Sequence, residues 1–343
     1  MRAVRIHQFG TADNLIYEED VPEPIPQHGE VKVRVRACAL NHLDIWVRNG
    51  IPAYQTPLPH ILGSDIAGEV AEVGSGVKDW RVGDLVVIYP VVTCGQCRFC
   101  RTGRENLCLQ VQVIGAHRAG GYAEYIVVPS RNLLPKPSPL SYEEASAVPL
   151  VFLTAWHMLI TLARLQPGEW TLIMGGSSGV GSAAIQIAKL RGALVIATAG
   201  TETKMQQCLE LGADVGVNHS DPEWWKQVKQ LTEGEGVDVV FEHIGQSVFD
   251  PCVRLLGKGG RLVTCGATTG QTAQFDIRYL FSREIEIHGA YIGTRAELAQ
   301  LLPHVEKGRL KPVVDSIFEL RYARLAHQKL ESRDFFGKIV LRI

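Results

Sequence analysis

Hydrophobic and polar residues alternate strictly over short stretches of the first part of the chain. In residues 30–37 valine occupies every second position, and lysine or arginine occupies most positions between. This period of two is typical of a strand with one buried face. Residues 65–73 and 84–89 are predicted strands too, glycines separate them, and residues 120–129 add another. Many short strands joined by glycine turns predict a β-rich, partly barrel-like first domain.

The pattern changes near residue 170. Continuous apolar runs then alternate with stretches of helical period. The predicted strands cover residues 170–174, 193–198, 214–218, 237–245, 261–266 and 284–293, and the predicted helices cover 181–190, 202–211, 221–231, 247–256 and 295–307. Apolar strands joined by helical crossovers of this length predict an α/β domain with a doubly wound parallel sheet.

Two segments suggest how these domains are arranged along the chain. The proline-rich stretch 133–141 is the predicted linker, and the final apolar run, 338–343, is predicted to return to the first domain as a strand. We therefore expect residues 134–306 to form the parallel-sheet domain, inserted between residues 1–133 and 307–343 of the β-rich domain.

Charge and composition narrow the class of protein. The 343 residues carry a formal net charge of −1, so nothing favours a polyanionic partner such as nucleic acid. Residues 1–10 alternate like a strand rather than forming the apolar core of a signal peptide, and no apolar run is long enough to span a bilayer. We expect a cytoplasmic protein that acts on a small-molecule substrate, with neither nucleic acid nor membrane as a partner.

Four of the eight cysteines fall within residues 94–108. They are Cys94, Cys97, Cys100 and Cys108. Four thiolates form the closed tetrahedral set that a structural Zn²⁺ needs. The spacing departs from the bacterial ferredoxin run, because seven residues precede the last cysteine and no proline follows it. Four thiols without a metal are the other alternative. We predict one structural zinc per chain and no chemistry at this closed site.

A glycine-rich turn lies between the first apolar strand of the second domain and its helix. It contains Gly176, Ser178, Gly179, Val180 and Gly181. Glycines let backbone N–H groups approach a pyrophosphate, and the following helix N-terminus adds partial positive charge. Serine interrupts the strict glycine pattern, but the position at the first strand–helix crossover predicts dinucleotide binding.

The residues after the second strand bear on the choice of nucleotide. A carboxylate for the ribose of NAD is expected about 20 residues after the turn, yet residues 198–201 contain none, and Lys204 follows closely. NADP is therefore favoured, with NAD possible. The alternative is that Lys204 is a solvated lysine at a helix start.

Together these motifs resemble the medium-chain dehydrogenase/reductase superfamily over essentially the whole chain. The resemblance implies a GroES-like catalytic domain interrupted by a Rossmann coenzyme domain, and a homodimer or homotetramer. The cysteine lobe is similar to that of the zinc alcohol dehydrogenases. Where those enzymes carry three catalytic zinc ligands, this chain has Asn41, Ser64 and Leu150. These cannot replace cysteine and histidine as zinc ligands.

The active-site pattern instead resembles the quinone oxidoreductase branch, since residues 41–50 follow its N-x-x-D-x-aromatic-x-R-x-G motif. The resemblance implies catalytic roles for Asn41, His42 and Asp44. It also implies further cofactor-binding residues, which are Thr154, Thr201, Lys204, His219, Gly266 and Arg333.

We therefore expect a reductase that transfers hydride from NAD(P)H to a quinone, an α,β-unsaturated carbonyl or an enoyl thioester without a catalytic metal. Two alternatives stay open. One is a zinc alcohol dehydrogenase with unusual ligands, for which Cys38 and His60 are the first candidates. The other is a protein that binds NADPH without turnover.

Overall fold

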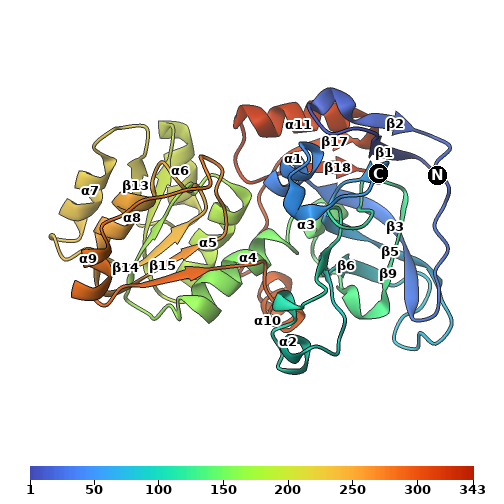
Figure 1. Ribbon diagram of the computed structural model, residues 1–343, viewed down its shortest axis with the longest axis horizontal. Coiled ribbons are helices and arrows are strands. Elements are labelled where there is room, and N and C mark those ends of the chain that lie inside the picture. The colour runs from blue at the N-terminus through green and yellow to red at the C-terminus, as the bar shows by residue number, and fades with distance from the viewer. The chain divides into compact units, whose positions relative to one another are not determined.

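The computed structural model describes residues 1–343 and divides into two compact units. The first contains residues 1–150 and 294–343, and the second contains residues 151–293. In Figure 1 the first unit holds both the blue N-terminal and the red C-terminal elements, so the two ends of the chain fold together. This GroES-like and Rossmann-like pair confirms the predicted fold class.

The first unit is built around a seven-stranded sheet of order β10-β6-β5-β3-β18-β17, with β9 also paired to β3. Two smaller sheets accompany it, β2-β1-β4 and β7-β8. The strands are β1 (Ala3–Ile6), β2 (Ile16–Glu18), β3 (Glu30–Ala39), β4 (His60–Ile61), β5 (Asp65–Val73), β6 (Leu85–Ile88), β7 (Val91–Val92), β8 (Gln112–Val113), β9 (Tyr125–Pro129), β10 (Leu133–Pro135), β17 (Val314–Glu319) and β18 (Lys338–Arg342). The valines of β3 are buried, as their alternation predicts.

Short helices complete this unit. They are α1 (His42–Arg48), α2 (Arg98–Arg101), α3 (Tyr142–Ser146), α10 (Arg295–Glu306) and α11 (Ala323–Ser332), with 3₁₀ turns η1 (Ala12–Asn14), η2 (Pro52–Tyr54), η3 (Glu105–Leu107), η4 (Ser130–Asn132) and η6 (Leu320–Tyr322). The final strand β18 lies antiparallel to β3 and parallel to β17, which confirms the predicted return of the chain end to the first domain.

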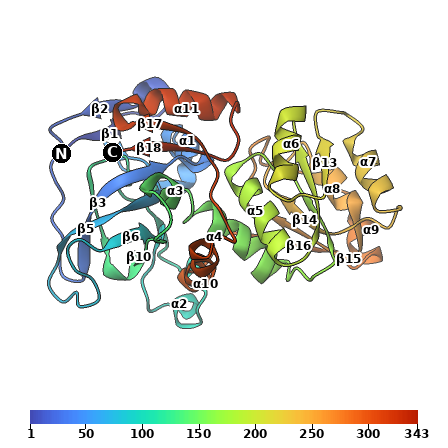
Figure 2. The ribbon, with the colours of Figure 1, turned by 180° about the vertical axis from the view of Figure 1, so that it is seen from behind.

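The second unit contains a six-stranded sheet of order β13-β12-β11-β14-β15-β16, in which all pairs are parallel. Figure 2 shows this sheet with helices around it. Its elements are α4 (Val151–Trp156), the π-helix η5 (His157–Leu162), β11 (Trp170–Ile173), α5 (Gly179–Leu190), β12 (Leu194–Ala199), α6 (Glu202–Glu210), β13 (Val215–Asn218), α7 (Trp224–Leu231), β14 (Val237–Glu242), α8 (Phe249–Leu255), β15 (Leu256–Thr264), α9 (Ile277–Ser282) and β16 (Glu286–Gly289). The strands pack in a buried apolar core, so the doubly wound sheet is confirmed.

The expectation that residues 133–141 form a linker is wrong. Residues Leu133–Pro135 form β10, which pairs with β6 inside the first unit. Pro135 suits this position because β10 is an edge strand of the sheet. Helix α3 then packs against β3 and β5, so the compact first unit extends to residue 150 rather than 133.

The first unit also resumes earlier than residue 307. Thr294 caps α10, and the guanidinium of Arg295 donates to the carbonyls of Arg131 and Leu133. These bonds fix the start of α10 to the first unit, which resumes at residue 294. No helix of the structure is long and apolar enough to cross a membrane.

Candidate functional site

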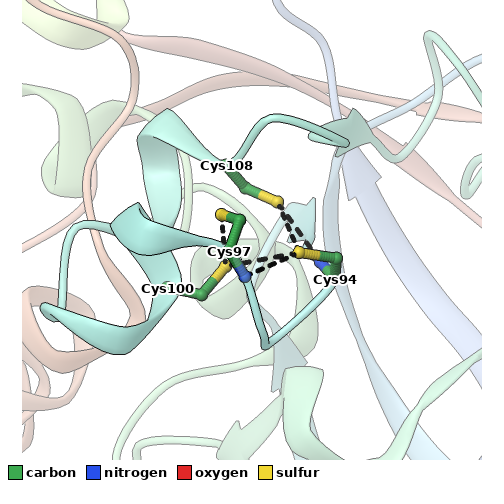
Figure 3. A group of neighbouring side chains, drawn as sticks. All are labelled: Cys94, Cys97, Cys100 and Cys108. Carbon is green, nitrogen blue, oxygen red and sulfur yellow. Dashed lines mark hydrogen bonds between the residues drawn. The ribbon is translucent and has the colours of Figure 1, made fainter.

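The four cysteines of the lobe converge on one point, as their spacing predicts. Their sulfur atoms all lie within 4.8 Å of one another and face inward in Figure 3. Cys97 and Cys100 flank the start of α2, and Cys94 and Cys108 come from the segments before and after it. Four sulfurs at these separations fit a tetrahedral Zn²⁺ with no open coordination position.

Backbone groups in the lobe favour thiolates. The N–H of Cys97 donates to the sulfur of Cys94 at 3.4 Å, and the N–H groups of Cys94 and Gln110 donate to that of Cys108 at 3.3 Å. Backbone N–H donors, foremost that of Cys100, lower the pKa of Cys97 to about 6. Such donors stabilise the charged form of a metal-ligating sulfur. The lobe therefore provides what a structural metal requires.

The glycine-rich turn joins β11 to α5 in the second unit. Ser178 caps α5, because its hydroxyl accepts the N–H of Gly181 at 2.9 Å. A Cβ on Gly181 would lie 2.2 Å from the carbonyl oxygen of Gly175, so no larger residue fits there. Gly179 and Val180 form the first turn of the twelve-residue helix. The turn thus presents a free helix N-terminus suited to an anion.

The end of β12 is tied to this turn. The hydroxyl of Thr198 accepts the N–H of Gly175 at 3.0 Å and is hydrogen-bonded to Nδ1 of His219 at 3.0 Å. The carbonyl of Thr198 accepts the N–H of Gly176 at 2.7 Å. Thr201 caps α6 by accepting the N–H of Lys204 at 3.3 Å.

The structure therefore gathers most of the predicted cofactor residues on the second unit. His219 lies beside the glycine turn, and Thr201 and Lys204 lie at the start of α6. Gly266 follows β15, where a Cβ would meet the carbonyl oxygen of His243 at 2.6 Å. Thr154 is a buried residue of α4. Arg333 belongs to the first unit, as the left-handed C-cap of α11.

In the first unit a buried lysine contacts Asn41, one of the residues at the expected zinc-ligand positions. The ammonium of Lys338, on β18, donates to Oδ1 of Asn41 at 2.6 Å, to Oδ2 of Asp65 at 2.9 Å and to the carbonyl of Leu40 at 2.6 Å. Its side chain is 4% exposed and that of Asp65 is 0% exposed. The three bonds use all three ammonium donors, so the charge is fully paired.

Ser64 and Leu150, at the other two expected zinc-ligand positions, form hydrogen bonds of their own. The hydroxyl of Ser64 donates to the carbonyl of Ile114 at 2.6 Å, and the backbone N–H of Leu150 donates to Oδ1 of Asp65 at 2.6 Å. Nδ2 of Asn41 donates to Oδ2 of Asp65 at 3.0 Å. Asn41 and Asp65 thus form one hydrogen-bonded unit with Lys338. The side chains at the three expected positions do not fit Zn²⁺, because they are an amide, a hydroxyl and an alkyl group.

Asp44 organises the start of α1. It is fully buried, and its carboxylate accepts the N–H of Asn41 at 2.8 Å and that of Gly63 at 3.2 Å. Burial raises the pKa of Asp44 to about 6, against the lowering effect of these donors. His42 begins the helix and lies edge-on to Trp46, with ring centroids 5.9 Å apart. The predicted residues Asn41, His42 and Asp44 are therefore adjacent at one helix N-terminus.

The alternative ligand pair does not assemble a metal site. Cys38 and His60 are both buried, and burial raises the pKa of the Cys38 thiol and lowers that of His60. Neither joins a group of three possible ligands; the four cysteines of the lobe form such a group. The geometry therefore does not support a displaced catalytic zinc at these residues.

Sequence reasoning missed Lys338 and Asp65 as parts of this site. For Lys338 the available signal was its place at the start of the predicted final strand, residues 338–343. A lysine beginning a buried strand needs a buried anion, but the sequence alone does not say which one.

Comparison with known proteins assigns two segments of the chain to described families. Residues 27–138 match the family described as alcohol dehydrogenase GroES-like domain, and residues 179–307 match that described as zinc-binding dehydrogenase. The chain is 30% identical to a quinone oxidoreductase of Rattus norvegicus, over 99% of this chain and 97% of that protein. It is 32% identical to a crotonyl-CoA reductase of Streptomyces avermitilis, over 89% of this chain and 77% of that protein.

Among solved structures, an NAD-dependent alcohol dehydrogenase matches with a TM-score of 0.97 and 46% identity, over 100% of both chains. The names of these relatives cover three oxidoreductase activities, so likeness alone leaves the substrate open.

Proposed function

The chain belongs to the medium-chain dehydrogenase/reductase superfamily, and from this premise we propose that it reduces a quinone, an α,β-unsaturated carbonyl or an enoyl thioester with NAD(P)H and without a catalytic metal. It is an NAD(P)-dependent oxidoreductase that acts on small molecules. The nature of the acceptor and the metal-free chemistry are the proposal.

The observation that carries the proposal is the ammonium of Lys338. It lies within 2.6 Å of Oδ1 of Asn41 and 2.9 Å of Oδ2 of Asp65, in a place shielded from solvent. The ammonium neutralises the carboxylate of Asp65, so this carboxylate is not free to bind a divalent ion. Asn41 and Ser64 also supply neutral oxygens instead of the thiolate and imidazole that zinc prefers.

This arrangement suits one kind of acceptor better than another. Alcohol oxidation needs the substrate hydroxyl to lose a proton, a step that a bound metal assists by lowering its pKa. Reduction of an activated alkene instead places hydride on the β-carbon and charge on a carbonyl oxygen, which ordinary hydrogen bonds can stabilise. NAD(P)H, when bound, supplies the hydride, and a proton from solvent or a side chain completes the reduction.

NADP is the proposed nucleotide. The end of β12 lacks the carboxylate that would bind the NAD ribose, and Lys204 and His219 lie at the segments that follow β12 and β13. The ammonium of Lys204 would attract a 2′-phosphate, and the His219 ring could donate a hydrogen bond to it. The four-cysteine lobe is proposed to hold one structural zinc, and the working assembly is proposed to be a homodimer or homotetramer.

A side-by-side assay tests the proposal. The full-length, zinc-loaded protein is given NADPH with a panel of quinones, enones and enoyl thioesters, and NADP⁺ with ethanol or benzyl alcohol. Each reaction is run with and without a chelator that leaves the four-cysteine metal in place. We expect reduction of the panel, insensitive to chelator. Robust, chelator-sensitive alcohol oxidation would contradict the metal-free site. Tight NADPH binding without turnover of any acceptor would favour the binding-protein alternative.

A further inference from the structure

A chain of four buried side chains runs from the end of α1, through α11 and Tyr122, back to the start of α1. Nη1 of Arg48 lies 3.1 Å from Nδ1 of His327, and Nε2 of His327 lies 3.1 Å from the hydroxyl of Tyr122. That hydroxyl donates to Oδ2 of Asp44 at 3.2 Å. Each of the four residues is at most 1% exposed. At its outer end, Arg48 is paired with the partly exposed carboxylate of Glu331.

The direction of this chain follows from proton counting. A guanidinium can only donate, so Nδ1 of His327 must be the acceptor, and the neutral ring carries its proton on Nε2. Nε2–H then donates to the oxygen of Tyr122, whose single proton is left for Asp44. Every hydrogen bond therefore points toward Asp44.

Asp44 accepts donors on both of its oxygens. Oδ2 accepts the hydroxyl of Tyr122 and the N–H of Asn41, and Oδ1 accepts the N–H of Gly63. Three donors therefore point at the carboxyl group, and each of them binds the ionised form more strongly than the neutral form. The chain of hydrogen bonds favours an ionised Asp44, whereas burial alone would favour its neutral form.

The ionised carboxylate connects the two segments that carry the candidate site. Its bond to Asn41 holds the N-terminus of α1, and its bond to Gly63 holds the turn directly before Ser64 and Asp65. Asn41 and Asp65 in turn bind the ammonium of Lys338. Loss of charge at Asp44 would weaken both backbone bonds at once.

We propose that Tyr122 and His327 are positioning residues that keep the Asp44 carboxylate ionised and so hold Asn41 in register for reduction. The inference rests on the proposed function for its kinetic consequence, but the protonation state of Asp44 can be measured without turnover.

Two other titratable groups, those of Lys338 and Cys38, lie near Asp44 and remain in every variant considered below. Lys338 from β18 favours its ionised form. Cys38 from β3 lies close to both Asp44 and Asp65, and burial keeps its thiol neutral by raising its pKa. Replacing Tyr122 therefore removes a hydrogen-bond donor to Asp44 without removing a charge.

The experiment compares four full-length, zinc-loaded variants. Tyr122→Phe and His327→Phe break the chain, whereas His327→Gln preserves an acceptor for Arg48 and a donor for Tyr122. The matched control is Tyr125→Phe, whose hydroxyl accepts from the exposed Arg34. Infrared difference spectra recorded between about pH 5 and pH 8 report the protonated carboxyl band of Asp44, assigned by its loss in Asp44→Asn. The acid limb of kcat/KM is measured in parallel.

We expect Tyr122→Phe to move both the infrared titration and the acid limb upward by about one to two pH units, because a hydrogen bond to a charged group is lost. His327→Phe should move both in the same direction by less, because Tyr122 keeps its bond to Asp44 but loses the donor that directs its proton there. His327→Gln and Tyr125→Phe should stay within a few tenths of a unit of the parent protein. Breaking variants that lower kcat equally at all pH values, with an unmoved infrared titration, would overturn the inference. If the protein reduces none of the acceptors, the infrared titration alone tests the role of Tyr122 and His327. Failure of the proposed function can therefore be distinguished from failure of this inference.

Discussion

Replacing Lys338 by methionine would leave the carboxylate of Asp65 buried without its counter-ion. Methionine fills a similar volume but cannot donate to Asn41, Asp65 or the carbonyl of Leu40, which the ammonium contacts at 2.6 to 2.9 Å. Removing one partner of a buried ion pair costs about 3–5 kcal/mol. The bonds from Asn41 and Leu150 to Asp65 remain, so the lower part of that range is expected.

A second substitution tests the cause. In the double variant Lys338→Met/Asp65→Asn, the new amide is neutral and still accepts the N–H of Leu150. It should therefore recover about 2 kcal/mol or more of the loss, because no buried charge is left unpaired. Lys329→Met is the matched control, since Lys329 pairs with Asp315 nearer the surface at 2.5 Å. Its expected cost is about 1 kcal/mol or less.

The assay must report the first unit, because two-unit proteins need not unfold in one step. Hydrogen exchange of peptides from β3 and β18, followed in increasing denaturant, gives the free energy of opening for the sheet that contains Lys338. Equal costs for Lys338→Met and Lys329→Met, or strictly additive effects in the double variant, would refute the reasoning.

Three further predictions concern the metal, the nucleotide and pH. Cys97→Ser should remove one zinc per chain, measured by elemental analysis, and lower the melting temperature; an unchanged zinc content would contradict the lobe assignment. Lys204→Ala should weaken NADPH binding about tenfold in a fluorescence titration and leave NADH binding unchanged; equal losses would point to a helix-start role. Burial lowers the pKa of His327 from 6.5 to about 3, so the folded protein binds fewer protons than the unfolded chain below pH 6.5. Its unfolding free energy should therefore fall by about 1.4 kcal/mol per pH unit as pH drops below 6.5, relative to His327→Gln, and parallel pH profiles would exclude this.

The strands and crossovers were predictable where one period dominated the pattern. The alternation over residues 30–37 located β3, and the apolar runs from residue 170 located the parallel sheet, because burial on one face or on both leaves a direct mark on residue type. The proline-rich run 133–141 misled, because a proline at a sheet edge and a proline in a linker look the same in sequence.

The site was predictable only where its residues are neighbours in sequence. The cysteine lobe and the glycine turn each lie within a short stretch, and the structure brings their members together. Lys338, Tyr122 and His327 reach Asn41 and Asp44 from distant segments, and their partners are set by tertiary packing. A single sequence carries no record of which buried anion a lysine will meet.

The position of β18 has a consequence for how the protein matures. Lys338 binds the carbonyl of Leu40 across 298 residues of sequence, and β18 lies between β3 and β17 in the finished sheet. Until residues 338–342 have left the ribosome, β3 lacks its neighbour on that side, while the second unit already has all of its own strands. A nascent chain that already holds Asn41 and Asp65 therefore still lacks the ammonium that binds them, and it presents an open strand edge that can pair with another chain. Assembly of the site therefore waits for β18, and during that interval the open edge of β3 is exposed to aggregation and to chaperones.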